Sequence, residues 1–374
     1  MASFEFVGYL RPTKDKGSVK GFEKTEYDSG WMKERLRFGV SAGDNYHFVE
    51  VNAGRWKQED KNTIYLTDNN KKGFKISWAE RNDAEVIEKT AGWRVYTVNT
   101  ETYKRIQELK DNGEIEAAKK AETKKKHFLD RSEFCEYVNK LVNSEKFKDV
   151  KFKVKGNINY NYSQTNDRYY ETYEVNKIYR VDDDEEVYSK VNVEFFFDEN
   201  AYDDSMFEDY GKSIVSGYTP FYDPQTKNTW YCPMTLVMRD KKKADGLNKL
   251  VFSKFEDDEV RKVNLECDKI SGAQKVDITY DDLSDETKGL IDCGLYTMED
   301  VIAELGGNMY GERITELRIN KLGRGSSRGS ETTSYTLEHL KKKPMTQTQI
   351  VEEVVGDMFD DEVPFSIDDD DDDL

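Results

Sequence analysis

RLRFGVSAGDNYHFVEVN, residues 35–52, alternates apolar and polar side chains on both sides of the turn AGDN at residues 42–45. Alternation with a period of two is typical of β-strands, and a short polar turn between two such runs predicts a hairpin. In the first run one face is apolar and the other is basic: Leu36, Phe38 and Val40 against Arg35 and Arg37. We expect the apolar face to enter a core, which leaves both arginines outside.

The same pattern of short strands and polar turns fills two regions of the chain, residues 1–100 and about 147–266. Tyrosine is abundant, with 23 copies against 6 prolines, and this composition also favours sheet over helix. Several short strands at close spacing indicate a barrel or a sandwich. We therefore predict a mainly β (α+β) protein that contains two related small β-barrels.

Helical patterns separate and follow these regions. Residues 101–143 predict a helical connector in which Ser132 is a possible N-cap, and residues 281–306 predict two short helices capped by Ser284 and Thr297. For residues 281–306, a small helical pair packed on the second barrel is a better explanation than a DNA-reading helix-turn-helix, because the second predicted helix is acidic. From Gly323 onwards the glycine- and serine-rich sequence predicts a flexible linker.

The net charge of −18 is concentrated at the C-terminus. Residues 352–374 hold twelve acidic side chains and no basic one, so the first 351 residues carry only −6. Local basic faces therefore say more about the body than the total charge does.

Motifs for other functions are missing from the sequence. We find no apolar run long enough for a membrane helix, no secretory signal, and no CxxC pair among Cys135, Cys232, Cys267 and Cys293. Phosphate-loop and nucleophile-elbow motifs are absent, and the three histidines are far apart. We expect a soluble cytoplasmic protein, in the host cytoplasm if viral, with no enzymatic activity, no cofactor and no metal. Acidic residues 182–186 nevertheless leave a magnesium site open.

One long strand carries a row of lysines. In KFKVKGNINYNY, residues 151–162, Phe152, Val154, Ile158, Tyr160 and Tyr162 share one face. Lys151, Lys153 and Lys155 project from the other face with three asparagines. This is either an ordinary solvated face or a track for phosphates.

Aromatic residues next to basic ones suggest stacking with nucleic-acid bases. Tyr46 and Phe48 lie on a second apolar face of their strand, beside the two arginines, and each stacked base is worth about 1 to 3 kcal/mol. Similar candidates are Trp31 and Trp56, expected in loops next to Lys33 and Lys57, then Arg168, Tyr169, Tyr170 and Tyr173 after a hairpin turn, and Phe196. For each aromatic taken singly, a place in the core is the alternative.

The C-terminal tail resembles that of bacterial and bacteriophage single-stranded-DNA-binding proteins, whose OB-fold bodies end in a disordered acidic tail. Those of bacteria close on Asp-Asp-Asp-Ile-Pro-Phe, and DDEVPF at residues 360–365 is similar to that tip. The resemblance implies that Val363, Pro364 and Phe365 enter a pocket of replication or repair enzymes, with Asp360, Asp361 and Glu362 beside basic residues. The family's phenylalanine is its last residue, however, whereas SIDDDDDDL follows Phe365. The terminal run Asp368, Asp369, Asp370, Asp371, Asp372, Asp373 and Leu374 is therefore a second candidate anchor.

Together these patterns predict five regions: a first OB-like β domain at 1–100, a helical connector at 101–146, a second OB-like β domain at 147–280, a helical pair and strand at 281–322, and a flexible linker with the acidic tail at 323–374. The expected function is sequence-independent binding of single-stranded DNA in phage DNA replication, recombination or repair. The tail would compete with DNA and recruit replication or recombination proteins. Two alternatives stay open, a virion structural or interaction protein and a metal-dependent nuclease.

Overall fold

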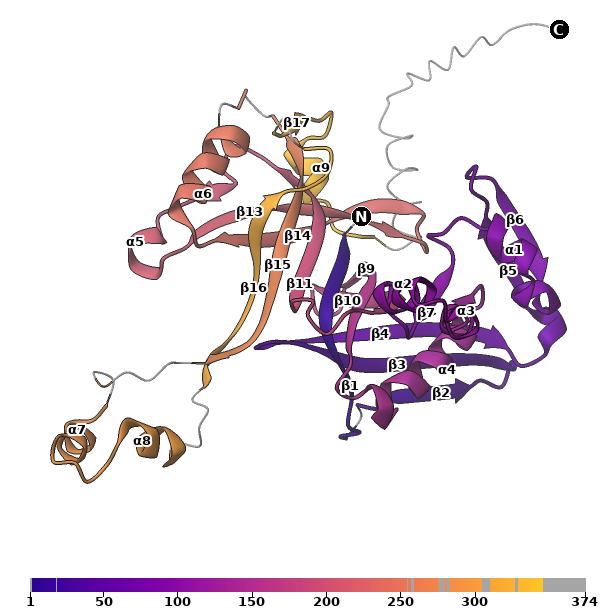
Figure 1. The fold of residues 1–374 in the computed structure, drawn as a ribbon. Coiled ribbons are helices and arrows are strands. Elements are labelled where there is room, and N and C mark those ends of the chain that lie inside the picture. Colours follow the sequence, from indigo (N-terminus) through magenta and orange to yellow (C-terminus); the bar gives the residue numbers. More distant parts are fainter. Residues whose placement is uncertain are drawn as a thin grey trace, which may run out of the picture.

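The computed structural model describes residues 2–17, 19–253, 255–256, 259–275, 280, 283–304, 310–326 and 329–345. Among these residues fifteen strands join in one continuous sheet, and β5 (Thr63–Thr67) and β6 (Gly73–Ser77) form a separate ribbon (Figure 1). The prediction of a mainly β protein is confirmed. In the described part of the chain, no helix has the length and apolar character needed to cross a membrane.

The first barrel is a closed ring of five strands. Its members are β1 (Ser3–Pro12), β3 (Trp31–Ala42), β4 (Asn45–Trp56), β9 (Lys151–Ser163) and β10 (Arg168–Arg180). Around the ring β1 pairs with β3, β3 with β4, β4 with β10, β10 with β9, and β9 returns to β1. Of these five pairs in the ring, only β4 and β10 run in parallel, at Glu50 and Glu174. A five-stranded Greek-key ring of this kind is an OB fold.

The second barrel repeats this order. Its members are β11 (Tyr188–Phe197), β13 (Ser213–Asp223), β14 (Asn228–Met238), β15 (Arg261–Lys275) and β16 (Tyr310–Leu322). The ring runs from β11 through β13, β14, β16 and β15 back to β11, and its parallel pair is again the third strand with the fifth. The prediction of two OB-like barrels is confirmed.

The two barrels share one sheet and one core. Their first strands, β1 and β11, pair from Ser3 opposite Asn192 to Val7 opposite Tyr188. A single cluster of buried side chains extends through both rings and includes Phe6 of the first and Leu236 of the second.

The boundaries that we predicted for the barrels differ from the observed ones. Residues 101–146 do not connect two barrels, because they lie between the third and fourth strands of the first barrel, which ends at Arg180. The first barrel closes only when β9 pairs with β1, with Gly156 opposite Phe4. A pairing between strands so far apart in sequence leaves no trace in local alternation.

Gly156 allows β9 to take this position. A Cβ atom added there would lie 1.9 Å from the carbonyl oxygen of Glu174 on β10, a distance that no side chain tolerates. Glycine inside a strand commonly marks such a close approach of two backbones.

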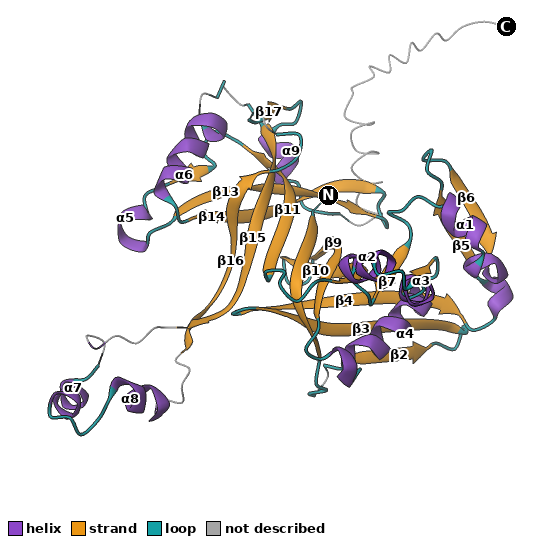
Figure 2. Ribbon diagram, in the orientation of Figure 1, coloured by secondary structure: helices purple, strands orange, loops and turns teal. Residues whose placement is uncertain are grey.

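The helical region after the first three barrel strands contains two strands as well. Its elements are β7 (Tyr96–Asn99), α2 (Tyr103–Asp111), α3 (Ile115–Glu122), β8 (Lys125–Phe128) and α4 (Arg131–Val142). Figure 2 shows α4 lying across the strands of the first barrel, and it contacts β3 and β4. Its N-cap is Asp130, whose carboxylate accepts a hydrogen bond from the backbone N–H of Glu133. The predicted cap, Ser132, is instead buried in the first helical turn.

Short elements complete the two barrels and the β5–β6 insertion. They are β2 (Phe22–Glu26), η1 (Glu59–Lys61), η2 (Trp78–Asn82), α1 (Ala84–Lys89), η3 (Glu145–Phe147), β12 (Tyr202–Asp203), α5 (Phe207–Tyr210), α6 (Lys241–Leu247) and η4 (Asn248–Phe252).

The predicted helical pair is present as α7 (Asp285–Asp292) and α8 (Met298–Glu304). The predicted caps are correct: Ser284 accepts from the N–H of Thr287, and Thr297 from that of Asp300. Figure 1 shows the pair beyond the far ends of β15 and β16, away from the barrels, so the expectation that it packs on the second barrel is wrong.

The described residues after Gly323 are packed as far as Met345, although a flexible linker was predicted. β17 (Glu331–Thr332) pairs with β15, and α9 (Leu337–Lys341) places Leu340 in a fully buried position. Ser326 also fixes this segment to the barrel, because its hydroxyl accepts a hydrogen bond from the N–H of Asn264 on β15. The predicted tail residues from Asp360 to Leu374 lie outside the described residues.

Candidate functional site

The β3–β4 hairpin presents one outward face along its whole length. Leu36, Phe38 and Val40 are buried, as predicted, so the odd positions of β3 point away from the core. In the observed register Trp31 lies opposite Trp56, Arg37 opposite Glu50, and Ser41 opposite Tyr46. The hairpin therefore places eight predicted DNA-binding residues on or at the end of one face: Trp31, Lys33, Arg35, Arg37, Tyr46, Phe48, Trp56 and Lys57. In OB folds, the second and third strands form the surface that binds oligonucleotides.

An aromatic pair occupies the end of this face near the turn. The rings of Tyr46 and Phe48 have centroids 5.1 Å apart in an edge-to-face arrangement, and 51% of Phe48 is exposed. The tyrosine ring lies over Gly39, where an added Cβ would come within 2.0 Å of its hydroxyl oxygen. Burial raises the pKa of Tyr46, against the opposing charge of Arg11, so the hydroxyl stays neutral near pH 7. Phe48 thus offers an exposed ring on a rigid support.

Two arginines stand beside this pair and share one carboxylate. Arg35 donates from Nε to Glu50 at 2.8 Å, and its Nη2 lies 2.7 Å from the same oxygen. The Nη2 of Arg37 is 3.7 Å from that oxygen. Glu50 is buried beneath both guanidinium groups, so it holds them in place while two positive charges outnumber one negative charge.

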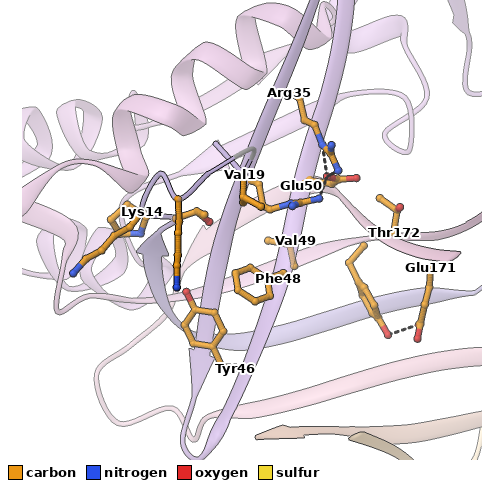
Figure 3. Close-up of a pocket in the computed structure, with 14 residues that line it drawn as sticks. Lys14, Val19, Arg35, Tyr46, Phe48, Val49, Glu50, Glu171 and Thr172 are labelled. Atoms are coloured by element: carbon orange, nitrogen blue, oxygen red, sulfur yellow. Dashed lines mark hydrogen bonds and ion pairs between the residues drawn. The ribbon is translucent and has the colours of Figure 1, made fainter. Parts of the chain in front are cut away.

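A groove of about 750 Å³ connects these residues (Figure 3). Its walls come from three places: Lys14, Lys16 and Val19 of the β1–β2 connection, the outward face of β3 and β4, and Glu171, Thr172 and Tyr173 of β10. Tyr173 donates a hydrogen bond to Glu171 at 2.9 Å. Lys14, Lys16 and Glu50 were not among the residues that we predicted. Glu50 was detectable from the hairpin register, whereas nothing local indicates that the β1–β2 connection folds toward Phe48.

A second aromatic pair lies at the other end of the hairpin. Trp31 and Trp56 have ring centroids 5.3 Å apart, and they sit at strand ends instead of in the loops that we expected. The ring of Trp31 covers Gly54. At roughly 3.3 Å per residue, Trp56 lies about 26 Å along β4 from Phe48. Exposed Lys33 and the two arginines project from the strand between the two pairs.

Lys151, Lys153 and Lys155 lie on the outward face of β9, as predicted, but each has a partner, either in the β10–β11 connection or on β1. Lys151 donates to the carbonyl oxygen of Glu185, Lys153 forms an ion pair with the Glu185 carboxylate at 2.8 Å, and Lys155 pairs with Glu5. None of the three lysines lines the groove beside Phe48. Their positive charge is thus partly offset, on a surface separate from that groove.

The four residues after the β9–β10 turn have different environments. Tyr170 is exposed, and the guanidinium of Arg168 lies 5.6 Å from its ring centroid. Tyr169 and Tyr173 pack against the core, and only Tyr173 reaches the groove. At the hairpin tip, Arg168 and Tyr170 are therefore the residues that remain accessible as candidates for DNA binding.

Phe196 is not available for stacking. Only 4% of it is exposed, because its ring packs 5.4 Å from Tyr231 and 5.7 Å from Tyr335, with Leu340 in the same cluster. The segment from Gly329 to Met345 supplies Tyr335 and Leu340 to this cover, and it lies over β14, the counterpart of β4, which supplies Tyr231. In the second barrel, the face equivalent to the β3–β4 face is partly closed by the chain itself.

His47 is buried with a hydrogen-bond partner, and the acidic run at 182–186 is engaged by a lysine. Burial, together with the charge of Lys269, lowers the pKa of His47 to about 3, and its Nε2 lies 2.7 Å from the Ser189 hydroxyl. Within the acidic run, Glu185 is engaged by Lys153. Among the described residues, no group of three His, Cys, Asp or Glu side chains is placed to hold a metal ion.

Comparison with known proteins gives similarity at the level of structure alone. No protein-family model matches the sequence, and no curated protein sequence matches it. Among solved structures, the wild-type single-stranded DNA binding protein from Thermus aquaticus is similar, with 8% identity and a TM-score of 0.33 over 87% of this chain and 92% of that one. A deletion variant of the same protein has 7% identity and a TM-score of 0.31, over 87% and 94% of the two chains.

Proposed function

We propose that the protein binds single-stranded DNA without sequence preference through the β3–β4 face of its first barrel. The observation that carries the proposal is the order of side chains on that face: an aromatic pair, a row of cations and a second aromatic pair. Any base stacks on an exposed ring, and any phosphate is attracted to a cation, so such a surface needs no particular sequence. Lys14 and Lys16 add cations from the opposite wall of the groove.

We place this activity in phage DNA replication or recombination, where single strands need to be coated. Arg168 and Tyr170 at the β9–β10 tip, together with the lysines of β9, are secondary candidates for contact with the strand. The acidic residues 352–374 compete with DNA for the cationic groove, and once released they recruit replication or recombination proteins. The proposal requires no cofactor.

The test is fluorescence anisotropy with labelled oligo-dT and a mixed-sequence oligonucleotide of equal length. Full-length protein is titrated over a salt series beside a truncation that lacks residues 352–374. We expect similar affinity for both oligonucleotides, tighter binding by the truncation, and weakening with salt at about 0.7 log units per phosphate contact for each decade of salt. The absence of binding by either protein at low salt would refute the proposal, while equal binding by both proteins would refute tail competition only.

The lysines of β9 are tested separately by changing Lys151, Lys153 and Lys155 together to alanine. If all three contact phosphates, the magnitude of the salt slope falls by about 2, at roughly 0.7 per contact. An unchanged slope would show that their partners Glu5 and Glu185 keep them from the DNA.

A further inference from the structure

The β5–β6 ribbon is a folded platform inserted between the third strand of the first barrel and α4. One of its faces is closed by a small core in which Leu66 and Ile76 pack with Val95 and Leu129. Val86 and Ile87 from α1 cover the same side. The ribbon is therefore held in shape independently of anything that binds its other face.

The other face combines an exposed aromatic ring with cations. Tyr65 is 75% exposed, and its cross-strand partner is Lys75, which is also exposed. Residues 57–77 contain five lysines and three acidic residues, a net charge of +2 in a protein whose total is strongly negative. One of those acids, Asp68, is occupied at the hairpin turn, where it accepts hydrogen bonds from the N–H groups of Asn70 and Lys72.

The base of the ribbon is fixed to the end of the β3–β4 face. The Asn62 side chain accepts a hydrogen bond from the N–H of Trp56 at 2.8 Å and donates one to its carbonyl oxygen at 3.0 Å. The ammonium of Lys61 lies 5.7 Å from the Trp56 ring centroid. A single-stranded nucleic acid that extends past the Trp31–Trp56 pair would therefore next meet the cations of the ribbon.

We propose that the open face of the β5–β6 ribbon is a further subsite for single-stranded nucleic acid, continuous with the β3–β4 face. Tyr65 stacks with a base there, and Lys75 contacts the backbone phosphates. This inference rests on the proposed function and extends its track beyond the barrel. It requires that long strands gain contacts which short strands cannot make.

The experiment compares Tyr65→Ala with wild-type full-length protein on an oligo-dT series of about 6 to 30 nucleotides, which brackets the roughly 4 to 16 nucleotides bound per OB fold. Tyr65→Phe keeps the ring, and Tyr103→Ala removes a tyrosine that is 79% exposed on α2 and outside both surfaces. We expect Tyr65→Ala to weaken binding of the longest oligonucleotides by at least about 5-fold, the lower limit for one lost stack. Tyr65→Ala should bind the shortest oligonucleotides with wild-type affinity. Tyr65→Phe and Tyr103→Ala should bind every length with wild-type affinity.

The outcomes distinguish a failure of this inference from a failure of the proposed function. If wild type binds every length and Tyr65→Ala binds the longest as tightly as wild type, the ribbon subsite is refuted while the β3–β4 site stands. An equal loss at all lengths would also refute a subsite that extends the track. If wild type binds no oligonucleotide, the proposed function fails together with the inference.

Discussion

Replacement of Phe48 tests whether the exposed ring on the β3–β4 face stacks with bases. The side chain is half exposed and contacts Tyr46 along one edge, so its ring has an open face toward the groove. Loss of one base–aromatic stack costs about 1 to 3 kcal/mol, which corresponds to roughly 5- to 150-fold in Kd. We expect Phe48→Leu, which keeps apolar volume but removes the ring, to weaken oligo-dT binding within that range.

The same change has little effect on the fold. Complete burial of a phenylalanine contributes about 1.5 to 3 kcal/mol, and Phe48 is only half buried. Because leucine retains most of the packing, we expect the free energy of unfolding in urea to fall by about 1 kcal/mol or less.

Two companions complete the design, both measured by anisotropy at a fixed salt concentration. Phe48→Trp keeps an aromatic surface and is expected to bind within about 3-fold of wild type, well inside the loss of one stack. Tyr103→Leu removes a more exposed ring from α2 and is expected to leave the affinity unchanged. Wild-type affinity in Phe48→Leu, or an equal loss in Tyr103→Leu, would contradict stacking at this position.

Three further variants test the cations, the core and the C-terminal cover. Arg35→Ala with Arg37→Ala is expected to lower the magnitude of the salt slope by about 1.4, from two lost phosphate contacts at roughly 0.7 each, and an unchanged slope would show that Glu50 keeps both from DNA. Because the pKa of His47 is lowered in the folded protein, only the unfolded chain protonates this imidazole as pH falls from 6.5 toward 3. The stability that depends on neutral His47 is therefore fully present above pH 6.5 and is lost progressively below it. Between pH 6.5 and 5, the decrease in the free energy of unfolding in urea should be about 2 kcal/mol smaller for His47→Gln than for wild type. Parallel pH profiles of the two proteins would contradict the assignment. Leu340→Ala should lower the free energy of unfolding by about 2 to 5 kcal/mol or speed amide hydrogen exchange in α9. If neither change is observed, α9 does not hold the cover in place.

Local alternation was sufficient to predict the candidate groove in part. The side chains of Arg35, Arg37, Tyr46 and Phe48 come together because a hairpin brings neighbours in sequence into register, and both the period of two and the turn are visible in the sequence. The same reasoning placed the lysines of β9 on an outward face. Two barrels were predictable from repeated short strands.

Long-range pairing accounts for what the sequence could not show. The partners that reduce the charge of Lys153 and Lys155 are Glu185 and Glu5, which belong to other segments of the chain. Phe196 was a candidate for stacking, but Tyr231 of β14 and the segment from Gly329 to Met345 bury it. These contacts form only when distant strands and segments meet, so no pattern within one strand records them.

Photocrosslinking tests the location of the binding surface most directly. Full-length protein is irradiated with an oligo-dT that carries a photoreactive thymine analogue, and the attachment sites are mapped by mass spectrometry of the digested protein. We predict crosslinks to peptides that contain Tyr46 and Phe48 or Trp31 and Trp56, with none to the covered Phe196. Crosslinks confined to the second barrel, or bound oligonucleotide that leaves the β3–β4 peptides unmodified, would contradict the assignment of this face.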